Sequence, residues 1–242
     1  MNFSGNKSSL RYIAEAAAIV VSILLAFAID AWWDNRQERV FEQEALLGLR
    51  AEYQDHLGEI SQAKVRHLVY LRTIEELVNA CGKGSGQSDE FSMDSAITVL
   101  LIPETEDLGA GVRDTLISSG KIEILSDRQL RYELSEWDSE LDELLDDQEH
   151  NAGIVFDIVI PYLARAGVPI SGSWGSESKY WALPRRSLSG DTETLTKLCS
   201  EPEFMTIVEA RYGFMVHAAG EFDRVISAID RILARIESSL TE

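Results

Sequence analysis

Cysteine is nearly absent from this sequence, with only Cys81 and Cys199, which lie 118 residues apart. That spacing excludes a CxxC redox or zinc motif. Neither cysteine has a histidine close to it in the sequence, which disfavours a role as a catalytic nucleophile. The two residues are therefore expected to be buried thiols or the partners of one disulfide, and a disulfide requires an oxidising compartment.

Signatures of common catalytic and nucleotide-binding sites are also missing. The sequence contains no GxxxxGK phosphate-binding loop followed by Ser or Thr, no GxSxG nucleophile elbow and no HExxH zinc motif. The glycine-rich run 82–86 and the Ser-Gly-Lys run 119–121 share residues with a phosphate-binding loop, but neither has its spacing. We interpret 82–86 as a flexible linker, and we predict no catalytic residue.

Histidine is scarce, yet three of the four histidines have an acidic neighbour at helical spacing. These pairs are Glu52 with His56, Asp147 with His150, and His217 with Glu221. A carboxylate-bridged di-metal site in a bundle uses two Glu-x-x-His pairs and two further carboxylates, whereas only one pair here has that spacing and its acid is aspartate. Because the chain has 41 acidic residues, such neighbours are expected by chance. No metal and no other cofactor is predicted.

Positive charge is in short supply. The chain has 22 Lys and Arg against 41 Asp and Glu, which gives a net charge of −19. Residues 1–33 contribute nothing to that balance, because their two basic and two acidic residues cancel. The acidic remainder repels nucleic acid, so nucleic-acid binding is disfavoured, and its charge favours solubility.

What the sequence does contain is one long apolar run, residues 12–33. Its only charged residues are Glu15 and Asp30, and at about 1.5 Å per residue it is about 33 Å long, the thickness of a bilayer core. Trp32 and Trp33 close it, where aromatic rings favour the membrane interface. A cleaved signal peptide would have a shorter apolar region followed by small residues, but WWDNRQER follows here. We predict a retained transmembrane helix.

The flanks of this helix specify its orientation only weakly. The flanking basic residues are Lys7, Arg11, Arg36, Arg39 and Arg50. Their numbers on the two sides are nearly equal, so the positive-inside rule decides little. A short basic N-terminus is typical of a signal-anchor, which favours a cytoplasmic N-terminus (residues 1–11) and a domain outside the cytoplasm (residues 34–242).

Small residues recur every four positions along one face of the predicted span. They are Ala14, Ala18, Ser22 and Ala26. Such a face lets two helices approach closely in lipid, so it predicts self-association or packing on another membrane protein. The alternative is an alanine-rich single span whose only partner is the lipid bilayer.

Apolar residues at alternating spacings of three and four predict three long helices after the span. The first seam is Tyr53, Leu57, Ile60, Lys64, His67, Leu71, Ile74 and Val78; the second is Leu130, Leu134, Trp137, Leu141, Leu144, Gln148, Asn151, Val155, Ile158 and Tyr162; the third is Met215, Ala218, Phe222, Val225, Ile229, Ile232 and Ile236. Since no such helix can bury its seam alone, we predict an all-α fold, in which the transmembrane helix continues into a bundle.

Shorter elements complete the predicted bundle. Accessory helices are expected at 95–102 and 112–119, a strand-like run at 121–125, and loops at about 81–91 and 167–190. Ser126 is the predicted N-cap of the second long helix and Pro161 is expected to kink its end. We also expect this helix to pack antiparallel to the first. If residues 87–125 carry the chain back instead, the two helices run in the same direction.

Polar residues interrupt two of the seams and form a candidate polar layer: Lys64, His67, Gln148 and Asn151. Three interpretations remain open for them. They specify the register of the bundle, they line a small ligand pocket, or they face water while neighbouring residues such as Ala63 complete the seam.

The segment 167–190 is the longest without periodicity, and it is basic in an acidic chain. Its candidate interaction residues are Trp174, Tyr180, Trp181, Arg185 and Arg186. Under the antiparallel arrangement this loop returns to the bilayer, where aromatic rings and basic side chains bind at the headgroups. Otherwise it lies at the opposite end, as a partner-binding loop or as a surface loop whose tryptophans cap the bundle.

Two stretches resemble an uncharacterised bacterial family of small single-pass membrane proteins. The first is RYIAEAAAIVVSILLAFAIDAWWDNRQER, residues 11–39, in which Glu15 fits the family and Asp30 and the doubled Trp depart from it. The second is TLISSGKIEILSDRQLR, residues 115–131. The resemblance implies a membrane anchor on a helical domain and contributes no functional residues.

From these patterns we expect a non-enzymatic, membrane-anchored helical domain for partner binding or complex assembly, with its domain in the periplasm and its anchor in a bacterial inner membrane. A ligand-sensing bundle is the first alternative. A metal-dependent enzyme of the helical-bundle type is the second and the less favoured.

Overall fold

The fold was analysed in a computed structural model that describes residues 6–82, 92–106, 108, 109, 111–168 and 192–241, with side chains from residue 15 onward except at 16 and 192. These residues form helices and no strand, which confirms the all-α prediction. The three longest helices are α1 (Asn6–Gly82), α4 (Arg128–Gly153) and α7 (Pro202–Thr241). The shorter ones are α2 (Met93–Leu100), α3 (Val112–Ser118), the 3₁₀ helix η1 (Lys121–Ile124), the π-helix η2 (Ile154–Val159), α5 (Ile160–Arg165) and α6 (Thr192–Ser200).

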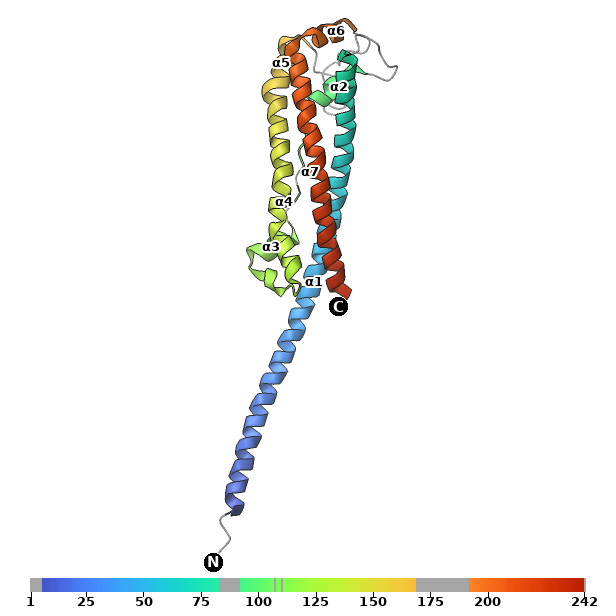
Figure 1. Cartoon of the computed structure of the whole chain (residues 1–242). Helices are drawn as coiled ribbons and strands as arrows, with labels where there is room; N and C mark the ends of the chain where they lie inside the picture. Colours follow the sequence, from blue (N-terminus) through green and yellow to red (C-terminus); the bar gives the residue numbers. More distant parts are fainter. Residues whose placement is uncertain (1–5, 83–91, 107, 110, 169–191, 242) are drawn as a thin grey trace, which may run out of the picture.

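Helix α1 is one uninterrupted helix of 77 residues. Its N-terminal part projects away from the bundle and its C-terminal part forms one side of it (Figure 1). One stretch of α1 is long and apolar enough to cross a membrane, with a mean hydropathy of 1.8 over 18 residues, and none of that stretch is buried in the structure. No proline interrupts α1, so nothing in the sequence separates the exposed apolar part from the bundle part.

We call the end of the bundle from which the apolar part of α1 emerges the near end, and the opposite end the far end (Figure 1). Helices α1 and α4 both run from the near end to the far end, and α7 packs along both in the reverse direction. Helices α3 and η1 lie at the near end, whereas α2, α5 and α6 lie at the far end.

The expected antiparallel arrangement of the first two long helices is therefore wrong, because residues 92–127 return the chain to the near end. This return segment runs along α1 towards the near end and forms a hydrogen bond with it at three successive positions. His67 Nδ1 lies 2.8 Å from Glu104, Arg113 N donates to Glu52 at 3.1 Å, and Ser126 N donates to Glu42 at 2.6 Å. Helix α4 consequently starts at the near end, and its continuation through η2 and α5 reaches the far end.

Two hydrophobic clusters fill the bundle. The far cluster joins α1, α2, α5, α6 and α7 through residues such as Ile74, Leu100 and Phe204. The near cluster joins α1, α4 and α7 through residues such as Leu49 and Leu134. All seven residues of the third predicted seam are buried, and six of them belong to these clusters, which accounts for the long α7.

The second seam shifts by one residue at the π-helix η2. The sequence pattern predicted Ile158 in the core, but Ile158 is 47% exposed and Val159 is 1% exposed. A π turn contains more residues than an α turn, so it advances the buried position by one. Pro161 follows at the start of α5, where its missing N–H and its ring disfavour a regular α-helical turn before it. The predicted kink is thus a π-helical segment.

Three local predictions need correction. The N-cap of α4 is Asp127, which accepts hydrogen bonds from the N–H groups of Gln129 and Leu130, rather than Ser126. The strand-like run 121–125 is a 3₁₀ helix, entered through Gly120 with φ of 69°. The first accessory helix starts at Met93 instead of residue 95, because Ser92 accepts a hydrogen bond from Ser95 N at 3.3 Å and so caps it.

Candidate functional site

Buried polar side chains meet in the middle of the bundle, where the two hydrophobic clusters adjoin. His67 comes from α1, Gln148 and Asn151 from α4, Arg211 from α7, and Glu104 from the return segment. We call these five residues the polar layer. All five are buried. Lys64 was predicted with them, but it lies half-buried at the surface and forms an ion pair with Asp223.

His67 is held by two acceptors. Its Nδ1 lies 2.8 Å from Glu104 Oε2, and its Nε2 lies 2.7 Å from the carbonyl oxygen of Met215. A carboxylate and a carbonyl only accept hydrogen bonds, so both ring nitrogens must donate and the ring is the imidazolium. Burial lowers the pKa of His67, but the hydrogen bond and the negative charge of Glu104 outweigh burial, and the net effect is a raised pKa.

Arg211 is completely buried, with 0% of its surface exposed. Its Nη1 donates to Asn151 Oδ1 and its Nη2 donates to the carbonyl oxygen of Ile102 at 2.6 Å, while its Nε has no partner. Burial lowers the pKa of Arg211 to about 10, and the nearby Glu104 opposes that shift. Arg211 therefore remains charged at neutral pH, and Glu104 faces two cationic side chains.

The polar layer fixes the return segment in place. Gln148 Oε1 accepts from Glu106 N at 2.7 Å, and its Nε2 has no partner. Together with the contacts of Ile102 and Glu104, this bonds residues 102–106 to all three long helices. Two buried donors, Arg211 Nε and Gln148 Nε2, are left without an acceptor.

Sequence reasoning found three members of the polar layer and missed two. Arg211 extends the third seam by one step, since Val208, Arg211 and Met215 keep the spacing of three and four and all are buried. That signal was available in the sequence. Glu104 lies in a segment without periodicity, and no local pattern distinguishes it from the other acidic residues.

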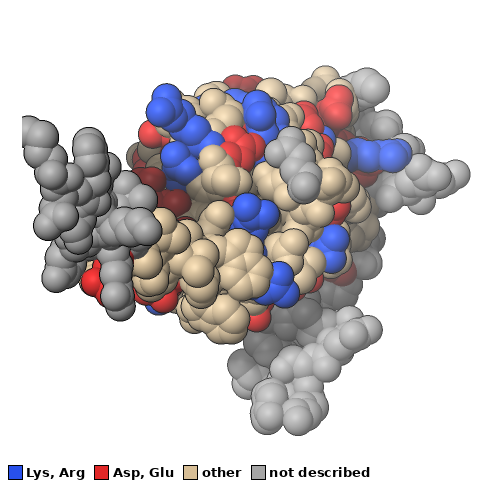
Figure 2. Space-filling view, turned by 90° about the horizontal axis from the view of Figure 1, so that it is seen from below, with Lys and Arg blue, Asp and Glu red and all other residues tan. Residues whose placement is uncertain are grey.

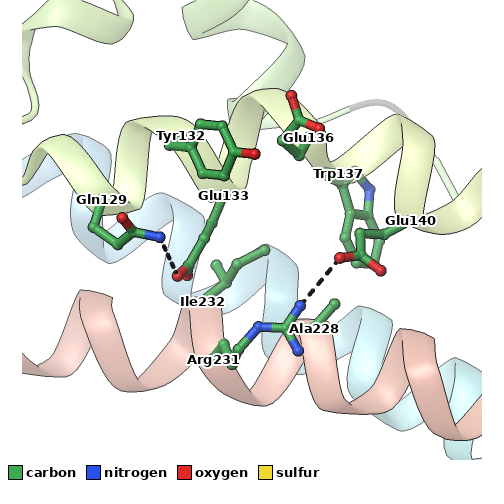
Figure 3. A pocket seen from close by; sticks show the side chains of 9 residues that line it. All are labelled: Gln129, Tyr132, Glu133, Glu136, Trp137, Glu140, Ala228, Arg231 and Ile232. Atoms are coloured by element: carbon green, nitrogen blue, oxygen red, sulfur yellow. Dashed lines mark hydrogen bonds and ion pairs between the residues drawn. The ribbon is translucent and has the colours of Figure 1, made fainter.

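A second feature is a groove between α4 and α7 in the near half of the bundle, with a volume of about 260 Å³ (Figure 3). It is lined by Gln129, Tyr132, Glu133, Glu136, Trp137, Glu140, Ala228, Arg231 and Ile232. Arg231 from α7 pairs with Glu140 from α4 at 3.2 Å, and Gln129 donates to Glu133 at 3.1 Å. The three glutamates make the groove acidic, and two of them already have partners on its walls.

The three histidine–acid pairs of the sequence do not form a common site. His56 is buried beside Trp137, with ring centroids 6.0 Å apart, while its neighbour Glu52 accepts from Arg113 N. His150 Nδ1 contacts the Asp146 carbonyl at 2.7 Å. His217 is exposed and contacts Asp147 at 2.7 Å, which raises the pKa of His217. Within the described ranges, no three His, Cys, Asp or Glu side chains are grouped as metal ligands.

Cys81 and Cys199 form a disulfide, with their Cα atoms 5.1 Å apart. It joins the C-terminal end of α1 to α6 at the far end, across 118 residues of sequence. Of the alternatives that the sequence left open for the two cysteines, the structure contains the disulfide.

The remaining predicted residues lie outside the bundle core. Ala18, Ser22 and Ala26 are exposed on the projecting part of α1, where Ser22 Oγ donates to the Ala18 carbonyl at 2.8 Å, and the Ala14 side chain is outside the described set. Trp174, Tyr180, Trp181, Arg185 and Arg186 also lie outside the described residues. Described residues on either side of that segment, Val168 before it and Leu195 and Leu198 of α6 after it, belong to the far cluster, away from the projecting part of α1.

Comparison with known proteins adds no relative: no family model, no curated protein and no solved structure matches this chain.

Proposed function

We propose that this chain is a single-pass, membrane-anchored, non-enzymatic helical domain that binds a partner or assembles a complex. The observation that carries the proposal is the continuity of α1. The same helix contains an unburied apolar stretch and the side of the bundle that packs on α7. Such a helix ties the position of the bundle directly to that of the membrane segment, without a flexible linker. The resemblance of residues 11–39 and 115–131 to single-pass membrane proteins supports the same architecture.

The disulfide supports a location of the bundle outside the cytoplasm. Disulfides persist in oxidising compartments such as the periplasm and are rare in the cytosol. Because Cys81 and Cys199 both belong to the bundle side of the chain, the compartment of the disulfide is the compartment of the domain. We therefore propose a periplasmic domain on a bacterial inner-membrane anchor.

Topology can be tested in intact cells. Protease added to spheroplasts should digest the bundle, and thiol-trapping before lysis should find Cys81 and Cys199 oxidised. A bundle that is digested only after lysis, with both thiols reduced, would overturn the proposed orientation and leave the anchor standing. Release of the protein by alkaline carbonate would overturn the anchor itself.

The partner proposed first is a second copy of the span, through the face that contains Ala18 and Ser22. Leucine at position 18 would separate two backbones that approach there. We expect Ala18→Leu to reduce cross-linking of the full chain in membranes. Ala17→Leu is the matched control, since it adds the same bulk one position earlier, about 100° around the helix. Equal cross-linking of the two variants would exclude this face, and another membrane protein would then be the better candidate.

A ligand-sensing bundle is the second candidate, and the two unpaired donors of the polar layer favour it. An acceptor oxygen of a small ligand would satisfy Arg211 Nε or Gln148 Nε2. Acetate serves as a probe. It should raise the unfolding temperature of the wild type and have a smaller effect on Gln148→Met. Equal shifts in the two proteins, or none in the wild type, would remove this candidate.

A further inference from the structure

Basic side chains are paired almost everywhere in the described structure except at the near end. Most form an ion pair or a hydrogen bond to a carboxylate, as Arg66, Arg113 and Arg224 do. The exposed basic side chains without a printed partner, among those that the structure describes, are Arg36, Arg39, Lys121, Arg128 and Lys197. Four of these five lie at the near end; Lys197, on α6, lies at the far end.

The near end is also close to neutral, although the chain is strongly acidic. Its three segments, residues 34–44, 120–131 and 231–241, hold seven Lys and Arg and seven Asp and Glu, a net charge of zero in a chain of −19. Seen from below, with the projecting part of α1 towards the viewer, basic side chains lie scattered among acidic and uncharged residues (Figure 2). The excess of negative charge is therefore carried by the rest of the chain.

The four free basic residues lie at the height of the headgroups if α1 crosses a bilayer. Arg36 and Arg39 follow Trp33 by three and six residues, about 5 and 9 Å along the helix. Ser126 N bonds to Glu42, so η1 and the first turn of α4 lie about 13 Å beyond Trp33. The headgroup layer is about 5–8 Å thick and the Debye length is about 8 Å, so the side chains of Lys121 and Arg128 are within range of lipid phosphates.

The helix surface at this height is also hollowed. A depression of about 280 Å³ is lined by Trp32, Asn35, Arg36, Arg39, Val40 and Gln43. The indole ring of Trp32 suits the interface between the acyl chains and the headgroups. The guanidinium groups of Arg36 and Arg39 can form bidentate hydrogen bonds with lipid phosphates.

We propose that the near end of the bundle docks on anionic lipid headgroups through Arg36, Arg39, Lys121 and Arg128. The proposal rests on the membrane anchor proposed above and deepens it, because it assigns a lipid-binding surface to the bundle itself. In the docked arrangement the near end contacts the headgroups and the acidic rest of the bundle points away from the membrane. This orientation reduces the repulsion between the anionic lipids and the carboxylates of a chain with a net charge of −19. Contacts of α1 alone would set only its depth in the bilayer. Because Lys121 and Arg128 lie to one side of α1, their contacts also restrict the tilt of the bundle relative to the bilayer.

The test uses the full chain reconstituted into bilayers of phosphatidylcholine with a minor fraction of phosphatidylglycerol. Spin-labelled analogues of the two lipids report the preference of the protein for the anionic one. We expect the wild type to prefer phosphatidylglycerol, and Lys121→Gln/Arg128→Gln to lower that preference, by up to about fivefold for each side chain removed. Added salt should weaken the wild-type preference. Lys197→Gln, which removes the free basic residue at the far end, should change nothing.

Three outcomes are distinguishable. Loss of preference in the Lys121/Arg128 variant, with Lys197→Gln unchanged, supports the proposal. An unchanged preference in that variant, with a loss only in Arg36→Gln/Arg39→Gln, overturns the role of the bundle and leaves lipid contact to α1 alone. Extraction of the wild type by alkaline carbonate overturns the anchor, and headgroup docking falls with it. The substituted residues are exposed and unpaired, and circular dichroism of each variant verifies its helical content.

Discussion

His67 and Glu104 form a buried ion pair, 2.8 Å long, between α1 and the part of the return segment that follows α2. The pair is charged because the second ring nitrogen of His67 also donates, to Met215. A buried histidine without such partners would lose its proton. The stability of the bundle is thereby linked to pH near neutrality, through one contact that fixes the return segment.

The first prediction is the sign of that linkage. The folded-state pKa of His67 is raised, so its contribution to stability is fully present below the unfolded-state pKa of about 6.5 and is lost as pH rises through the higher folded-state value. The free energy of unfolding should therefore fall as pH increases from about 6.5. Urea denaturation of the full chain in detergent, followed at several pH values, measures this slope.

Glu104→Gln should reverse the slope. Without the carboxylate, burial dominates and lowers the pKa of His67, so the folded state of the variant should lose stability on acidification below about pH 6.5. Asp147→Asn is the control, since it removes the partner of His217, which is exposed and screened by solvent. A slope that is identical in wild type and Glu104→Gln would show that His67 is not charged in the folded protein.

Replacement of Arg211 is the second prediction. Arg211→Met removes the hydrogen bonds to Asn151 and Ile102 and leaves the Glu104 carboxylate with His67 as its only cationic neighbour in the layer. Removal of one member of a buried charge group costs about 3–5 kcal/mol of unfolding free energy. Arg72→Met, which breaks the exposed pair with Glu76, should cost less than about 1 kcal/mol. Similar losses in the two variants would contradict the assignment of Arg211 to the buried layer.

Some residues of the polar layer could be predicted from the sequence and others could not. His67, Gln148 and Asn151 are on helices, where periodicity reveals which face is buried, and burial of a polar residue follows from its place in the seam. Glu104 has no period around it, and its burial depends on the path of the return segment across three helices. The same path decides whether α1 and α4 run in the same direction, so the wrong path for this segment also removed the argument that had placed residues 167–190 at the bilayer.

The third prediction concerns the disulfide between Cys81 and Cys199. It closes a loop of 118 residues, and removal of such a cross-link increases the conformational entropy of the unfolded chain. Cys81→Ser/Cys199→Ser should lower the unfolding free energy by about 2–4 kcal/mol, and reductant should lower that of the wild type to the same level. Denaturation of both proteins with and without reductant measures the effect. A wild type that is indifferent to reductant would mean that the two thiols are not joined.

The last prediction tests the register shift at η2, which no rule of periodicity anticipates. An α-helical seam through Val155 places Ile158 in the core, whereas the π turn buries Val159 and leaves Ile158 about half exposed.

Val159→Ala removes two buried methyl groups, about 0.8 kcal/mol each before any cavity is counted, so we expect the free energy of unfolding to fall by about 1.5–2.5 kcal/mol in urea denaturation. Ile158→Ala removes more atoms but from the surface, and it should change stability by less than about 0.5 kcal/mol. The two positions are adjacent, and both substitutions replace a β-branched residue of similar helix propensity by alanine, so backbone propensity does not separate them. The order of the two losses therefore reports which side chain is in the core: a larger loss at Ile158 would mean that α4 continues as a regular α-helix to Pro161 and that the π turn is absent.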